Sequence, residues 1–303
     1  MIGALKKHKS TLFRRTPGEQ LFDMSNIVFM LIVTFLTLYP FVFVLFSSVS
    51  LPSQLILHKG LLLYPRGFQM ESYRMVFLNP MIIVGYSNTI FYVVVGTALN
   101  ILMTTLAAYA LSRQNLYFKK SASLFIIFTM FFSGGLIPLY LQVKSYGLLD
   151  TRLALLLPSA VNVFNLIIMR TGFESVPASL EESARLDGAN DLQICFRVIL
   201  PLSLPVLAVI TLYYAVYHWN AWYHAMLFLK GRELYPLQLI LREILVGNQT
   251  DSMMEVVESG SKEALGEAIK YAAIVVAILP VICIYPFLQR YFIKGIMIGA
   301  VKG

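Results

Sequence analysis

RTGFESVPASLEESARLDGANDLQICFRVILPLSLP, residues 170–205, is the charged segment on which the fold assignment depends, because it lies between long uncharged runs. It contains five acidic residues and three arginines. Either Pro177, as a first-turn proline, or Ser179, in a capping box with Glu182, is expected to begin a short helix. Gly188 suits the left-handed residue that ends such a helix. We therefore predict a folded polar knob here rather than a plain loop.

A second short helix is expected after the glycine. Asn190 or Asp191 would cap it, since both residue types accept hydrogen bonds from the first turn of a helix. Leu192, Phe196 and Ile199 would then fall on one face. Two capped helices between apolar runs are costly to build without a role, so we interpret the knob as a docking surface.

The rest of the sequence has the composition of a membrane protein. Hydrophobic residues make up 58% of the chain and charged residues 13%, against roughly 25% charged residues in soluble domains. Each uncharged run is at or near the ~17 to 25 residues that a helix needs to cross the hydrocarbon, and none alternates as a spanning strand does. The sequence thus predicts an all-α membrane protein with six transmembrane helices. They are expected at about residues 26–48, 82–112, 121–143, 153–170, 201–222 and 271–292.

The placement of lysine and arginine predicts the orientation in the cell membrane. With the N-terminus inside, 14 basic residues fall in the cytoplasm and 10 outside, as the positive-inside rule favours. The N-terminal tail (1–25), the knob (171–200) and the C-terminal tail (293–303) would then be cytoplasmic, with an extracytoplasmic loop at 223–270. A basic tail beside anionic lipid explains the net charge of +8, so no nucleic-acid partner is expected.

Searches for catalytic and ligand-binding motifs favour a chain without an active site. It contains no P-loop, HExxH or GxSxG sequence, so we expect no enzyme activity and no cofactor bound by the chain itself. Cys195 and Cys283 lie on separate elements without metal-ligand spacing, which predicts neither a disulfide nor a metal site. His218 and His224 are expected to have hydrogen-bonded structural roles.

A longer motif runs through the charged segment. Residues 182–184 (ESA), Gly188 and residues 198–201 (VILP) have the spacing of the EAA loop, and the chain resembles the permease subunits of binding-protein-dependent ABC importers. Ser183 stands where alanine is usual in that motif. Three further segments resemble the carbohydrate branch of these permeases: AAYALSR at 107–113, the pair Trp219-Asn220, and YPLQLILREIL at 235–245. The ending KGIMIGAVKG at 294–303 resembles a subgroup serving complex oligosaccharides in Gram-positive bacteria.

This resemblance implies a type I ABC importer (MetI-like) permease fold, with the EAA loop as a cytoplasmic coupling helix. Such a permease pairs with a second homologous permease subunit and stands on a dimeric ABC ATPase, which binds ATP and Mg²⁺. It receives oligosaccharides or complex sugars from an extracytoplasmic solute-binding protein. A permease for an amino acid, a peptide or an ion is the alternative within the same class. A secondary transporter would need carboxylates inside its spans, and the uncharged runs contain none.

The resemblance also assigns coupling residues. Glu181 and Glu182 would face basic groups of the ATPase, while Leu192 and Phe196 would seat the knob against its own subunit. The residues expected to couple to the ATPase are Glu181, Glu182, Ser183, Ala184, Asp187, Gly188, Ala189, Leu200 and Pro201.

Candidate residues for the solute path come from an aromatic and amide stripe. Tyr213, Tyr217, Asn220 and His224 are spaced by four, three and four residues, which places them on one helical face. Aromatic rings can stack on sugar faces and amides can pair with hydroxyls. The predicted solute-path residues are Asn88, Tyr92, Asn162, Asn165, Tyr213, Tyr217, Trp219, Asn220 and His224. The competing interpretations are an aromatic belt at the membrane interface and asparagines that bond neighbouring helices.

Overall fold

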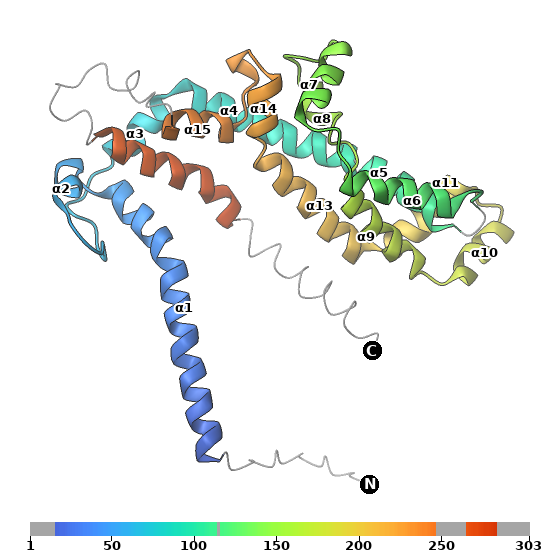
Figure 1. Cartoon of the computed structure of the whole chain (residues 1–303), viewed down its shortest axis with the longest axis horizontal. Coiled ribbons are helices and arrows are strands. Elements are labelled where there is room, and N and C mark those ends of the chain that lie inside the picture. The colour runs from blue at the N-terminus through green and yellow to red at the C-terminus, as the bar shows by residue number, and fades with distance from the viewer. Residues whose placement is uncertain (1–15, 114–115, 247–264, 284–303) are drawn as a thin grey trace, which may run out of the picture.

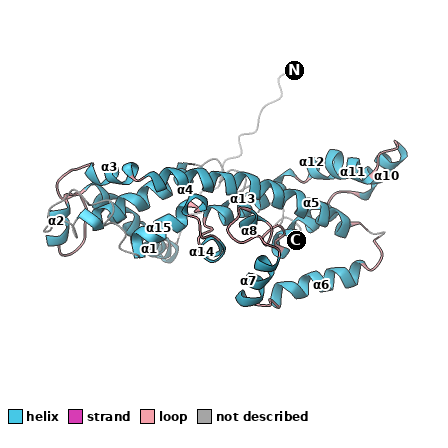
Figure 2. Ribbon diagram, turned by 90° about the horizontal axis from the view of Figure 1, so that it is seen from above, coloured by secondary structure: helices cyan, strands magenta, loops and turns pink. Residues whose placement is uncertain are grey.

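A computed structural model describes residues 16–113, 116–246 and 265–283. Helices and connecting turns account for all of the secondary structure in these ranges, and no strand occurs in them (Figures 1 and 2). The elements are α1 (Pro17–Val49), α2 (Pro52–Leu57), α3 (Glu71–Leu78), α4 (Pro80–Phe91), the π-helical turn η1 (Tyr92–Gly96), α5 (Thr97–Ser112), α6 (Lys119–Phe131), α7 (Leu136–Ser145), α8 (Leu153–Leu156), α9 (Val163–Glu174), α10 (Ala178–Leu186), α11 (Asp191–Ile194), the π-helical turn η2 (Cys195–Ile199), α12 (Leu200–Leu202), α13 (Leu204–Trp219), α14 (Tyr223–Phe228), the 3₁₀ turn η3 (Arg232–Leu234), α15 (Leu237–Val246) and a last helix, Leu265–Cys283.

The first helix stands apart from the others (Figure 1). Thr16 caps α1 and forms a capping box with Glu19, so the helix begins well before the expected residue 26. It has 33 residues, or about 50 Å of length, which exceeds the hydrocarbon thickness. Its most apolar stretch buries no residue within the chain, so lipid or another protein must cover that surface.

The second predicted span coincides with one continuous helix, Pro80–Ser112, formed by α4, η1 and α5. The π-helical turn in its middle inserts one extra residue per turn and marks a local irregularity. At its end, Gly96 lies against the ring of His218, where an added Cβ would come within 2.5 Å of Nε2. Only glycine therefore permits this approach of α13 to the long helix.

The third and fourth predicted spans are not continuous helices. The span expected at 121–143 is broken between α6 and α7, which are bent by 112° relative to each other. Gly135 occupies this break with a φ of +86°, a conformation that favours glycine. The span expected at 153–170 is helical only in α8 and α9, with an unwound stretch at 157–162 that contains Pro158.

The last two predicted spans also differ in their bounds. The helical run ending in α12 bends by 90° into α13, which ends at Trp219 rather than 222. The final helix begins at Leu265, within the stretch expected to be an extracytoplasmic loop, and its continuation beyond Cys283 lies outside the described residues. By length and composition, three described helices can cross a membrane, or up to five crossings if each bent pair counts as one.

Three apolar clusters hold the helices together. One joins α4 and α15 to the helix Leu265–Cys283, and another joins η1, α7, α8 and α14. The third packs α5, α9 and α13 against the knob, with Met169, Phe173 and Ile210 almost fully buried. The knob is therefore fixed to the same three helices that form the middle of the molecule.

Candidate functional sites

The knob begins with α10, whose first residue follows Pro177. Pro177 occupies the capping position, and no side chain caps this helix. The expected capping box of Ser179 with Glu182 is wrong, because Ser179 already lies inside the helix.

A glycine turn separates the two helices of the knob, as predicted. Gly188 has a φ of +81°. Its amide donates to the carbonyl oxygen of Arg185, and the amide of Ala189 donates to that of Ala184, both at 3.0 Å. These two bonds form a Schellman motif, which requires a left-handed residue at 188. Any side chain at this position would strain the turn between the helices.

Asn190 caps the second helix and forms a capping box with Gln193, which decides between the two predicted caps. The apolar face differs from the prediction. Leu192 is 61% exposed and Phe196 39% exposed, so neither seats the knob on the rest of the chain. Ile194, Cys195 and Ile199 are buried there instead, with the π-helical turn η2 starting at Cys195. Its extra residue rotates the buried face away from the expected spacing.

The two adjacent glutamates of α10 have different surroundings. Glu181 binds Arg113 through Oε2 and Arg185 through Oε1, and its side chain is 17% exposed. Its hydrogen bonds raise the pKa of Arg185 above the usual value. Glu182 is exposed and pairs with no cation in the described part of the chain. Of the two predicted docking carboxylates, only Glu182 is available at the surface.

The remaining predicted coupling residues surround this surface. Ser183, Asp187 and Pro201 are exposed. Ala184, Ala189 and Leu200 are partly buried against the cluster that joins the knob to α5, α9 and α13. The knob thus presents the carboxylates of Glu182 and Asp187 outward together with small or apolar side chains, and Ala184 and Ala189 also close its glycine turn.

A groove of about 540 Å³ lies among α13, the start of α9 and the unwound stretch 157–162. Its walls are mainly apolar and aromatic, and among the residues lining it none is Asp, Glu, Lys or Arg. The lining residues are Leu139, Ala154, Leu155, Pro158, Ser159, Val161, Asn162, Phe164, Asn165, Tyr213, Tyr214, Tyr217, His224 and Phe228.

Five of the nine predicted solute-path residues meet in this groove: Asn162, Asn165, Tyr213, Tyr217 and His224. Asn162 caps α9 by accepting a hydrogen bond from the amide of Asn165 at 3.1 Å. The side-chain amide of Asn165 has no hydrogen-bond partner among the described residues, although Asn165 is only 5% exposed. The amide is therefore open to water or to a solute in the groove.

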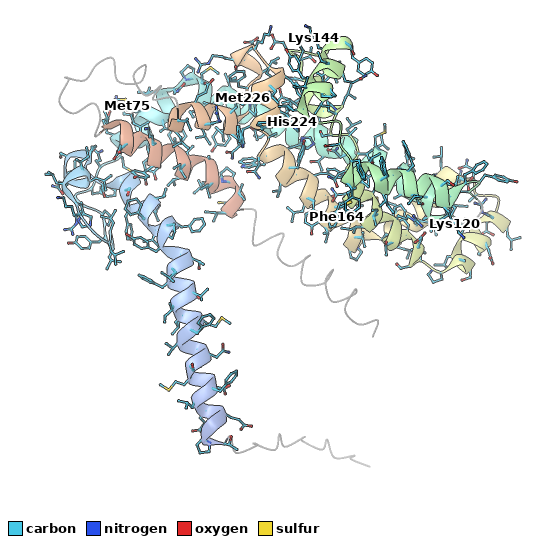
Figure 3. The ribbon with its side chains drawn as sticks, in the orientation of Figure 1. Met75, Lys120, Lys144, Phe164, His224 and Met226 are labelled. Carbon is cyan, nitrogen blue, oxygen red and sulfur yellow. The ribbon has the colours of Figure 1, made fainter. Side chains whose placement is uncertain are left out.

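Aromatic rings form the opposite wall. The ring of His224 stacks on Phe228 with centroids 5.7 Å apart, and its Nδ1 lies 3.3 Å from the hydroxyl of Tyr217. Phe164 and His224 come from different elements, as Figure 3 shows, and both line the groove. Flat rings and polar tips therefore face one another across a space large enough for a small solute.

The other four predicted solute-path residues lie elsewhere. Asn88 is 2% exposed and donates to the carbonyl oxygens of Glu233 and Tyr235, while Tyr92 is fully buried and donates to that of Leu234. Both side chains thus hold the η3 segment against the long helix. Neither residue lines the groove, and their place on the solute path stays a prediction.

Trp219 and Asn220 do not line the groove, because α13 ends there. The amide of Asn220 is exposed and donates to the carbonyl oxygen of Val216 in its own helix. Of the aromatic and amide stripe, Tyr213, Tyr217 and His224 therefore line the groove and Asn220 does not.

A buried polar network, which the sequence did not predict, supports the groove. Asn100 is fully buried; its amide donates to the carbonyl oxygen of Ser159, and its Oδ1 lies 2.6 Å from Nε2 of His218. The hydroxyl of Tyr214 accepts from the amide of Asn162 at 3.0 Å and contacts the hydroxyl of Thr104 at 2.7 Å. These bonds satisfy two backbone groups of the unwound stretch, the carbonyl oxygen of Ser159 and the N–H of Asn162, which would be costly to leave unpaired inside a membrane. The hydrogen-bonded structural role expected of His218 is confirmed.

Replacing Asn100 by leucine is expected to destabilise the protein, because it leaves Ser159 and His218 with unpaired buried polar atoms. Each such group costs about 1–3 kcal/mol, so the melting temperature should fall by about 5 °C or more. Asn220→Leu is the matched control, since its amide is exposed and bonds only its own helix. Thermal unfolding of both purified variants in detergent measures the difference. Equal melting temperatures would contradict the assignment of the network.

In the described residues, no cluster of His, Cys, Asp and Glu could hold a metal ion. Cys195 is a buried free thiol and Cys283 an exposed one.

Comparison with known proteins gives three consistent matches. The family model described as "Binding-protein-dependent transport system inner membrane component" matches residues 10–298. The chain is 42% identical over 288 residues to the polygalacturonan/rhamnogalacturonan transport system permease protein YtcP of Bacillus subtilis (strain 168), covering 94% of this chain and 99% of that protein. Protein LplC of the same organism is 39% identical, with 95% and 97% covered.

A solved structure is also similar. A chain in the crystal structure of a bacterial ABC transporter involved in the import of the acidic polysaccharide alginate superposes with a TM-score of 0.84. The two chains are 36% identical, and the match covers 92% of this chain and 99% of the other.

Proposed function

This chain belongs to the family of binding-protein-dependent transport system inner membrane components, and on that basis we propose that it forms half of the pathway by which an ATP-driven importer takes up oligosaccharides or complex sugars. It is a transport subunit and not an enzyme. In this proposal ATP and Mg²⁺ bind to a partner ATPase, and the chain has no cofactor of its own.

The groove is the observation that carries the sugar assignment. The unpartnered amide of Asn165 suits a sugar hydroxyl, and the rings of Tyr213, Tyr217 and Phe228 suit the faces of pyranose units. The absence of Asp, Glu, Lys and Arg from the lining residues disfavours a zwitterionic amino acid or an ion, which would need charged partners. The names of the relatives agree with a carbohydrate solute. The solved relative belongs to a transporter involved in the import of an acidic polysaccharide, and the groove of this chain offers no Lys or Arg for such acid groups, so a cation for them would have to come from the partner subunit.

The partners follow from the same assignment. A second homologous permease subunit would close the groove, and the exposed length of α1 gives it an apolar surface to pack against. A dimeric ATPase would bind the knob on the cytoplasmic side, with Glu182 outward. An extracytoplasmic solute-binding protein would deliver the sugar at the opposite end. We place the contact with that protein in the extracytoplasmic loop at residues 248–261, which lie outside the described residues.

The proposed topology has six crossings with both termini in the cytoplasm. The helices Pro17–Val49, Pro80–Ser112 and Leu265–Cys283 would make three of them, and the two bent pairs two more. Helices α8 and α9 with the unwound stretch between them would make the remaining crossing. Broken helices at membrane depth are expected where they line a cavity, as this stretch does.

Reconstitution tests the proposal directly. The chain would be co-purified with its partner permease and ATPase, placed in proteoliposomes, and supplied with the solute-binding protein. Uronic-acid oligosaccharides, neutral oligosaccharides and amino acids are the probes. We expect at least one oligosaccharide to accumulate and to stimulate ATP hydrolysis. Stimulation by an amino acid alone, with no response to any oligosaccharide, would contradict the sugar assignment.

A further inference from the structure

Five side chains from three elements form a closed ring at the base of the knob: Tyr109, Arg113, Glu181, Arg185 and Asp191. Arg113 binds Glu181, and its guanidinium lies 4.9 Å from the centre of the Tyr109 ring. Arg185 lies 3.0 Å from Glu181 and 2.6 Å from Asp191. The hydroxyl of Tyr109 closes the ring by donating to Asp191 at 3.5 Å. The ring thus connects the end of α5 with α10 and α11.

The members of the ring differ in burial. The side chains of Arg113 and Glu181 are both 17% exposed, whereas those of Arg185 and Asp191 are 47% and 65% exposed. Exposed ion pairs contribute little because water screens them. The Arg113–Glu181 pair, which joins the end of α5 to α10, is therefore stronger than the Arg185–Asp191 pair.

Helix α10 has few other attachments. None of its residues is buried, and of these only Ala184 packs against the neighbouring apolar cluster. Glu181 points toward α5, and Glu182 is exposed on the surface. Besides its two turns and the small contact of Ala184, two ion pairs connect α10 to other elements: the exposed Arg185–Asp191 pair and the more buried Arg113–Glu181 pair. Because water screens the exposed pair, the Arg113–Glu181 pair is the stronger link for a force applied to α10.

The element on the other side of this pair leads to the groove. Arg113 directly follows α5, and the same helix carries Thr104 and Asn100, whose side chains bond Tyr214 and Ser159 in the groove wall. A continuous helix transmits a displacement along its length without new contacts. Figure 2 shows α10 and α11 beside the end of α5, at the opposite end of the molecule from α2 and α3.

We propose that the Arg113–Glu181 pair is the joint through which movement of α10 reaches the groove, and that Arg113 is a positioning residue for energy coupling. The inference rests on the proposed function of α10 as the contact with an ATPase. The two adjacent carboxylates then have different roles: Glu182 faces the partner, and Glu181 holds α10 to the long helix.

The test uses the complete transporter and two matched variants. Arg113→Gln removes the charge of the joint. Arg170→Gln removes a comparable charge nearby, because Arg170 pairs with Glu174 at 3.0 Å within α9 and does not contact α10. We expect both variants to co-purify with the ATPase. Stimulation of ATP hydrolysis by loaded binding protein should fall about tenfold in Arg113→Gln, within the usual range of coupling energies, and stay near wild type in Arg170→Gln and in Arg113→Lys.

Exchange of the charges is the second readout. Arg113→Glu should be uncoupled, and combining it with Glu181→Arg should restore at least part of the stimulation, while Arg185 keeps Asp191. The inference is overturned if Arg113→Gln matches Arg170→Gln, if the exchanged pair is no better than Arg113→Glu, or if Arg113→Gln fails to assemble. A wild-type complex that no loaded binding protein stimulates would instead refute the proposed function itself.

Discussion

Replacing Glu182 by lysine is expected to abolish uptake, with a loss of at least about 100-fold. Glu182 is exposed on α10 and forms no ion pair among the described residues, although it lines a cavity shared with Arg113 and Arg185. In the proposed complex it faces basic groups of the ATPase, so the lysine would place like charges together, which costs several kcal/mol at an interface. The measurement is the amount of ATPase that co-purifies with the variant, together with hydrolysis stimulated by loaded binding protein.

Glu71→Lys is the control for this charge reversal. Glu71 also lies in a short helix with its side chain 43% exposed, and the ion pair it makes in the described part of the chain is a surface contact with Arg74 at 3.8 Å, which contributes little. This variant should bind the ATPase and transport as wild type does. If Glu182→Lys did the same, the knob would not be the surface that the ATPase grips.

Replacing Asn165 by leucine is expected to lower the maximal rate of sugar uptake by about tenfold. Leucine keeps nearly the same shape but removes an amide that lines the groove and makes no side-chain hydrogen bond within the described residues. A lost hydrogen bond to a sugar hydroxyl is worth about 1.4 kcal/mol, which corresponds to that factor. Because the binding protein captures the sugar first, the effect should appear in the rate at saturating binding protein. ATP hydrolysis should remain stimulated.

Asn220→Leu is the control that shows whether the effect is specific to the groove or common to the whole aromatic and amide stripe. Asn220 was predicted from its spacing to share a face with Tyr213 and Tyr217, but its amide is exposed at the end of α13 and bonds Val216. Its replacement should leave uptake within about twofold of wild type. Equal losses in Asn165→Leu and Asn220→Leu would mean that the groove is not the solute path.

Helix caps and turns were the features of the fold that could be predicted best from the sequence. The left-handed turn at Gly188 and the cap at Asn190 depend on a few neighbouring residues and on backbone sterics alone. The long helices also follow from uncharged runs of sufficient length. These features need no knowledge of what packs against them, which is why they could be predicted from one sequence.

Breaks within helices, the buried face of the knob and the partners of buried asparagines depend on tertiary packing, so they could not be predicted from the sequence. Hydropathy does not distinguish a straight span from one broken at Gly135 or unwound beside Pro158, since both runs are equally apolar. The extra residue in η2 changed which side chains of the knob are buried, and periodicity cannot show such a turn. Asn88 and Asn165 look alike in sequence. The structure gives the Asn88 side chain partners in Arg152 and in the carbonyl oxygens of Glu233 and Tyr235, whereas that of Asn165 has none among the described residues.

The network around Asn100 was missed for a related reason. Its partners lie 59 and 118 residues away, and no local pattern joins them. Polar residues inside apolar runs were nevertheless the available signal, since they tend to face the interior of a helix bundle. Thr104 and Asn100, four residues apart, could have been chosen on that ground.

Cysteine accessibility in whole cells tests most directly the claim that α10 is the cytoplasmic surface to which the ATPase binds. In a background with Cys195→Ala and Cys283→Ala, Glu182→Cys and Lys144→Cys place thiols on the knob and at the end of α7, where Lys144 is labelled in Figure 3. An impermeant maleimide should label Lys144→Cys in intact cells. It should reach Glu182→Cys only after permeabilisation, and more slowly when the ATPase is bound. Labelling of Glu182→Cys in intact cells would contradict the account, because no ATPase in the cytoplasm could grip that surface.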